Sequence, residues 1–151
     1  MEDRFTPGLF AGVIGDAFLQ IYFSLLSVFK IISRTYADYG EILIMAKAHE
    51  GPLAYVIGVT LEFIIGGLLG IIFAYLLKYT TTKFYMLKAV CLAMASWLFF
   101  LVPGTLYKLA LFEKVPPKDS FLMLIGSILW SIITAIAFKY LTDGFKVFYT
   151  E

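Results

Sequence analysis

Two carboxylic acids, Asp16 and Glu62, lie inside long apolar stretches of the chain. An ionisable side chain is costly inside a membrane, and where one occurs it commonly binds a cation, passes protons or pairs with another polar group. Gln20 follows Asp16 by four residues on the same stretch and is a candidate partner for either acid. These three residues are therefore the first candidates for chemistry in this chain.

The elements that would position these side chains are four apolar runs, at residues 8–32, 53–77, 85–107 and 121–141. Each run is long enough for a helix that crosses the ~30 Å hydrocarbon layer, which takes roughly 20 apolar residues. Hydrophobic residues make up 61% of the chain and charged residues 15%, whereas a soluble domain has about 45–50% and about 25%. The sequence therefore predicts a single all-α transmembrane domain, residues 1–151, built as a membrane four-helix bundle.

The two acids are expected at similar depths in the membrane. Asp16 comes eight residues after the start of its run and Glu62 nine residues after the start of its own. At ~1.5 Å per residue, each acid lies about 12–14 Å from the face at which its helix begins. If the two helices are antiparallel neighbours, the acids meet near the midplane, where they resist double ionisation and one is expected to hold a proton.

Two interpretations of this acid pair remain open from the sequence. The pair could bind a cation or pass protons, as acids within membranes often do. Alternatively, one protonated acid could form a structural hydrogen bond to a neighbouring helix, with Gln20, Ser127 or Thr134 as its partner.

Glycines accompany both acids at spacings that suit close helix packing. Those that the spacing singles out are Gly8, Gly12, Gly15, Gly58, Gly66 and Gly70. Small residues four apart let two helix backbones approach closely within a membrane, although glycine is also common in membrane helices without such a role. We expect these glycines to lie at helix–helix contacts, with the partner helix left open.

A short amphipathic helix is predicted between the first two spans, within residues 37–48. Tyr39, Ile42, Leu43 and Ala46 follow the i, i+3, i+4, i+7 spacing of one helical face. Such a helix could lie in the plane of the membrane interface or cap one end of the bundle.

Several classes of function lack their signatures in the sequence. Cys91 is the only cysteine and His49 the only histidine, which excludes an internal disulfide and a multi-histidine metal site. No phosphate-binding loop, nucleophile elbow or zinc-protease motif is present. A net charge of +1 without a basic patch argues against a nucleic-acid partner. We therefore expect no metal, no cofactor and no enzymatic activity.

The order of these features resembles a known family. The run Phe10-Ala11-Gly12-Val13-Ile14-Gly15 leads the first span, the second span is rich in glycine, and the third contains Lys88 and Trp97. This pattern is similar to that of the small YqhR-like membrane proteins of spore-forming Gram-positive bacteria. The resemblance implies four spans and a location in the bacterial inner membrane. It supplies no functional residues, and Asp16 and Glu62 match no motif of the family.

Charge gives a weak prediction of orientation. Basic residues divide evenly between the two sides of a four-span arrangement. The linker after the second span contains basic residues without an acid, which favours cytoplasmic termini in a multi-pass cell-membrane protein.

The sequence leaves three classes of function open. The first is a structural or accessory protein of a membrane assembly, whose partners are the lipid bilayer and either a second copy of the chain or another membrane protein. The alternative is a small transporter or channel subunit that moves protons or cations by way of Asp16 and Glu62. A membrane enzyme is the third.

Overall fold

The computed structural model describes residues 3–45, 51–109 and 112–148, and within these ranges it contains helices and no strands. The helices are α1 (Phe5–Val28), α2 (Tyr36–Met45), α3 (Pro52–Tyr79), α4 (Tyr85–Leu106) and α5 (Pro117–Phe148). Four of them, all except α2, are long and apolar enough to cross a membrane. The predicted all-α membrane four-helix bundle is confirmed, and the chain is a multi-pass membrane protein.

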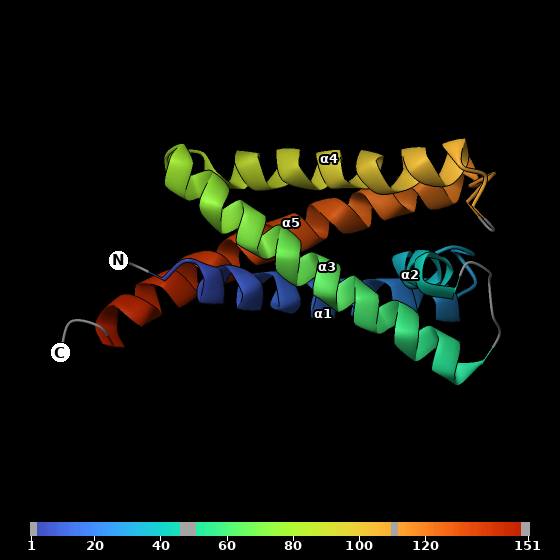
Figure 1. Ribbon diagram of the computed structural model, residues 1–151, viewed down its shortest axis with the longest axis horizontal. Helices are drawn as coiled ribbons and strands as arrows, with labels where there is room; N and C mark the ends of the chain where they lie inside the picture. The colour runs from blue at the N-terminus through green and yellow to red at the C-terminus, as the bar shows by residue number, and fades with distance from the viewer. Residues whose placement is uncertain (1–2, 46–50, 110–111, 149–151) are drawn as a thin grey trace.

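The helices form two antiparallel pairs that pack against each other (Figure 1). Helix α3 crosses α1, and α4 lies alongside the first half of α5, whose second half runs along α1. Both termini lie at one end of the bundle, which we call the terminal side. Helix α2 lies at the opposite end, which we call the α2 side.

Helix α1 ends at Val28, earlier than the predicted end at residue 32, because the chain turns there. Lys30 adopts a left-handed conformation with φ 52°, its N–H bonds the carbonyl of Ser27, and the N–H of Ile31 bonds the carbonyl of Leu26. This pair of bonds is a Schellman motif, which satisfies the last carbonyls of a helix. Helix α4 ends in the same way, with Lys108 as the left-handed residue. A lysine at this position also faces the negative end of the helix dipole.

Helix α5 begins at Pro117, before the predicted start at residue 121, because proline suits the first turn of a helix. Asp119 lies in the first turn of this helix, and its carboxylate bonds another segment. It accepts hydrogen bonds from the backbone N–H of Ser33 at 3.2 Å and from the hydroxyl of Ser33 at 2.6 Å. The loop that follows α1 is therefore tied to the start of α5.

Helix α2 packs against α3 through small residues. A Cβ on Gly40 would lie 2.7 Å from the carbonyl oxygen of Gly58, so neither position has room for a side chain. Of the predicted apolar face, Tyr39 and Ile42 are buried inside the bundle, whereas Leu43 is 47% exposed. The buried face centres on Gly40 because that residue allows the two backbones to meet. Ala46, the last member of the predicted face, lies outside the described residues.

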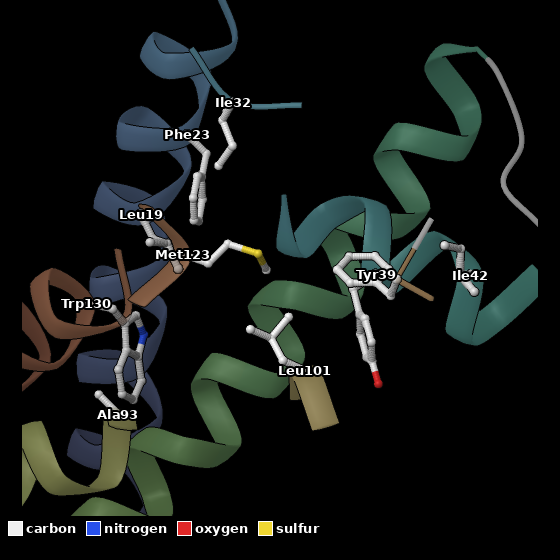
Figure 2. Close-up of a cluster of buried hydrophobic side chains, with 10 residues drawn as sticks. Leu19, Phe23, Ile32, Tyr39, Ile42, Ala93, Leu101, Met123 and Trp130 are labelled. Carbon is white, nitrogen blue, oxygen red and sulfur yellow. The ribbon is translucent and has the colours of Figure 1, made fainter. Parts of the chain in front are cut away.

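The interior contains two apolar clusters, one near the α2 side and one near the terminal side. The first comprises Leu19, Phe23, Ile32, Tyr39, Ile42, Ala93, Leu101, Phe112, Met123 and Trp130, and Figure 2 shows the indole of Trp130 lying alongside α1. The second comprises Ala11, Phe73, Ala74, Leu77, Ala89, Ala135 and Phe138. Leu19, Tyr39 and Trp130 of the first cluster also line the site that contains the two acids.

Candidate functional site

Glycines bring α1 and α3 into backbone contact. A Cβ on Gly8 would lie 2.9 Å from the carbonyl oxygen of Gly70, and a Cβ on Gly12 would collide with the backbone of Gly66. The two helices are antiparallel, so each step of four residues along α1 is matched by a step of four residues back along α3. The glycine spacing noted in the sequence thus lies at the contact between these two helices.

The next step of this register brings together Asp16 and Glu62. The carboxylate of Asp16 lies directly over Gly66, where a Cβ would overlap it. Glu62 is one turn of α3 away from Gly66, and both acids line the same cavity. Asp16 is 2% exposed and Glu62 is 7% exposed. The structure therefore places the two acids side by side within the membrane-spanning part of the chain.

The cavity at this pair, which we call the inner cavity, has a volume of about 50 Å³. That volume has room for a few water-sized groups, since one water needs about 10–15 Å³ on this scale. All five helices contribute to its wall. Its polar lining includes Asp16 of α1, Tyr36 of α2, Glu62 of α3, Ser96 of α4, and Ser127 and Trp130 of α5.

The hydrogen-bond donors of this wall are largely engaged by other groups. The hydroxyl of Ser127 donates to the carbonyl of Met123 at 3.0 Å, so the hydroxyl of Tyr36 must be the donor in its 2.7 Å bond to Ser127. Burial raises the pKa of Tyr36 above its ordinary value, which keeps this donor protonated. The indole N–H of Trp130 donates to the carbonyl of Gly12 at 3.2 Å.

The two acids, in contrast, retain acceptors without partners. Gln20 donates from its side-chain amide to Oε2 of Glu62. Oε1 of Glu62 and Oδ2 of Asp16 are buried and accept no hydrogen bond. Buried acceptors normally have a partner, and two carboxyl groups close together in a low-dielectric cavity favour a bound proton or cation over two bare negative charges. The arrangement is therefore suited to a proton or a small cation.

A second, larger cavity, which we call the outer cavity, shares the lining residue Glu62 with the first. Its volume is about 400 Å³. It lies between the second half of α1, the segment that leads into α2, and the first half of α3. Its polar lining comprises Gln20, Ser24, Ser27, Ser33, Thr35, Asp38, Tyr55 and Glu62. Glu62 is the one residue that lines both cavities in the part of the chain that the structure describes.

The remaining residues singled out from the sequence are distributed among other contacts. Gly15 faces α5, where a Cβ would lie 2.9 Å from the indole of Trp130, and Gly58 faces α2. Among the three predicted partners for an acid, Gln20 bonds Glu62, whereas Ser127 bonds Tyr36. Oγ1 of Thr134 is buried without a partner. His49 lies outside the described residues.

The contribution of α2 to the site could not be anticipated from the sequence. Tyr36 lines the inner cavity, and Thr35 and Asp38 line the outer one. The only available signal was the placement of polar residues between two spans, which is equally typical of a solvated loop. Comparisons with models of known protein families, with curated proteins and with solved structures return no match for the chain.

Proposed function

We propose that this chain is a membrane protein that binds a proton or a small cation between Asp16 and Glu62 and serves as a subunit of a transport system. One observation carries the proposal: two buried carboxylates line one cavity, and each has an oxygen without a hydrogen-bond partner. We further propose a bacterial cell-membrane location, for which the family resemblance of the sequence is the support. We also propose cytoplasmic termini, which the charge of the linker after α3 supports.

The geometry favours this function over a purely structural role for the acids. A structural acid would form hydrogen bonds with its neighbours, since an unpartnered buried polar atom costs about 1–3 kcal/mol. Here one of the two carboxylates has a neighbour in Gln20, and each keeps an unpartnered oxygen. A bound proton or cation would satisfy both oxygens at once and would offset this cost.

A structural or accessory role in a larger assembly is the second candidate, and the packing on the terminal side supports it. Between the inner cavity and the terminal side, the bundle is filled by two sets of contacts. These are the glycine contact between α1 and α3 and the cluster around Phe73 and Phe138. A cation that reached the acids would need another subunit, a second copy or a rearrangement to leave on that side. We therefore describe the chain as a subunit rather than as a complete transporter.

The proposal is tested by ion flux in proteoliposomes that contain the purified protein, measured for protons, Na⁺ and K⁺. Glu62→Gln removes the charge of the central acid and keeps its shape, and Asp16→Asn does the same for its neighbour. The matched control is Glu41→Gln, because Glu41 of α2 is also 7% exposed but lines neither cavity.

We expect wild-type flux of at least one of these ions, loss of that flux in both cavity variants, and retention of it in the control. A wild-type protein that moves none of the ions, or a Glu62→Gln variant with normal flux, would refute the proposal. Binding of a radioactive cation to detergent-solubilised protein gives a second measurement, which does not require a complete pathway.

A further inference from the structure

The outer cavity has a composition that suits water and cations. Among the described residues that line it, the polar groups are hydroxyls, one amide and two carboxylates, and none is lysine or arginine. Asp38 lies in the part formed by α2, and Glu62, which also lines the inner cavity, lies in the part formed by α3. A cavity lined by one sign of charge concentrates ions of the opposite sign. Its chemistry therefore selects cations over anions.

The carboxylate of Asp38 is held in place by hydrogen bonds at the start of α2. Oδ2 of Asp38 accepts the backbone N–H of Thr35 at 2.6 Å and the hydroxyl of Thr35 at 3.0 Å. Both donors are neutral groups. They therefore hold the acid on the wall of the outer cavity without neutralising its charge. The negative charge of Asp38 thus remains available to attract a cation.

Gln20 lines the outer cavity beside Glu62, the residue that the two cavities share. Its amide donates to Glu62, and its carbonyl oxygen accepts the hydroxyl of Tyr55 at 3.5 Å. The side chain therefore links α1 to two points of α3 at the level at which the outer cavity ends. An ion that passes from the outer cavity to the inner one must meet Glu62, whose Oε1 has no partner.

We propose that the outer cavity is a water-filled access path through which small hydrated cations reach the acid pair from the α2 side alone, with Gln20 positioning the carboxylate of Glu62 at its inner end. The destination of the path rests on the function proposed above. The path itself rests on the outer cavity, on the hydroxyl and carboxylate groups that line it, and on the buried oxygen of Glu62. The closed packing of α1 against α3 places the access on one side.

The path is tested by the reactivity of introduced cysteines with water-soluble, membrane-impermeant thiol reagents. Cys91 is exposed on α4 and is first replaced by alanine. Ser24→Cys then places a thiol in the outer cavity, and Ser27→Cys provides a second position there. The control is Leu25→Cys, because Leu25 follows Ser24 directly at nearly the same depth, is 55% exposed and does not line the outer cavity.

We expect a cationic methanethiosulfonate reagent to modify Ser24→Cys and Ser27→Cys about tenfold faster than Leu25→Cys. At the two cavity positions, the cationic reagent should also react faster than an anionic one, once both rates are corrected for intrinsic reactivity. The reaction should occur only when the reagent is added on the side opposite to a C-terminal epitope tag. Equal rates at all three positions, no reaction in the cavity, a preference for the anionic reagent, or reaction from the tagged side would each overturn the path.

This experiment separates the path from the function on which its destination rests. Labelling detects water in the outer cavity whether or not the protein moves ions. If the cavity cysteines react as expected and the wild type shows neither flux nor cation binding, the access path stands and the transport function fails. If flux depends on Glu62 and the cavity cysteines do not react, the function stands and the path proposed for it fails.

Discussion

Substitution of Gly66 by alanine gives a sharp test of the contact on which the site is built. A Cβ at this position would overlap the carboxylate of Asp16, so this buried acid must leave its place between α1 and α3 and shift within the inner cavity. The adjacent Gly67 provides the control. A Cβ at Gly67 would lie 2.8 Å from the terminal methyl of Leu9, which can rotate away, and 3.5 Å from Val13.

The expected difference in the free energy of unfolding follows from what the two variants share and where they differ. Both replace glycine by alanine inside α3 and so share the same gain in helix propensity, about 1 kcal/mol in water. Only Gly66→Ala displaces a buried carboxylate from its place, and such overpacking costs about 1–3 kcal/mol. We therefore expect Gly66→Ala to be less stable than Gly67→Ala by about 1–3 kcal/mol, a factor of roughly 5 to 150 in the unfolding equilibrium.

The assay is reversible unfolding in mixed detergent, monitored by circular dichroism, for the two variants and for each combined with Asp16→Ala. Removal of the carboxylate makes room for the new methyl group, so the penalty of Gly66→Ala should shrink in that background, whereas that of Gly67→Ala should not change. Equal stability of the two single variants, or an unchanged penalty in the Asp16→Ala background, would refute the proposed contact.

Two further predictions concern the connections between distant segments. Asp119→Ala removes both hydrogen bonds to Ser33 and should destabilise the protein by about 1.5–3 kcal/mol, whereas Ser33→Ala removes one bond and should cost about 1 kcal/mol. The same unfolding assay measures both variants, and equal effects would argue against the pairing. Trp130→Phe leaves the buried carbonyl of Gly12 without its indole donor. It should destabilise the protein more than Trp97→Phe, which removes a 3.2 Å bond to the carbonyl of Ser120 at a half-buried position. A larger loss of stability for Trp97→Phe in thermal unfolding would contradict this ranking.

The sequence by itself was sufficient to predict the helical class and the four spans, because the cost of placing a residue in lipid depends on that residue and its immediate neighbours. It also indicated that Asp16 and Glu62 lie at similar depths, since depth follows from the number of residues along a helix. The glycine spacing predicted close helix contacts without saying which helices meet, because a pattern on one helix has no information about the shape of its partner.

Helix ends were predicted less well, since short-range geometry decides them. The first span ends at Val28 because Lys30 takes a left-handed conformation, and lysine gives no such signal in the sequence. The last helix begins at Pro117, and Asp119, a natural capping residue, lies in its first turn, where it is engaged by Ser33 of a distant loop. Both outcomes depend on backbone turns and tertiary contacts that hydropathy does not report.

The surroundings of the acid pair were decided by the tertiary structure alone. The match of Gly12 with Gly66 fixes the register of α1 on α3, and that register brings Asp16 against Glu62. The packing of Gly40 on Gly58 then brings Tyr36 to the wall of the inner cavity. The sequence determined that two acids lie within the membrane. Only the packing of helices far apart in the chain decided that they share one cavity, because such contacts depend on shape complementarity in three dimensions.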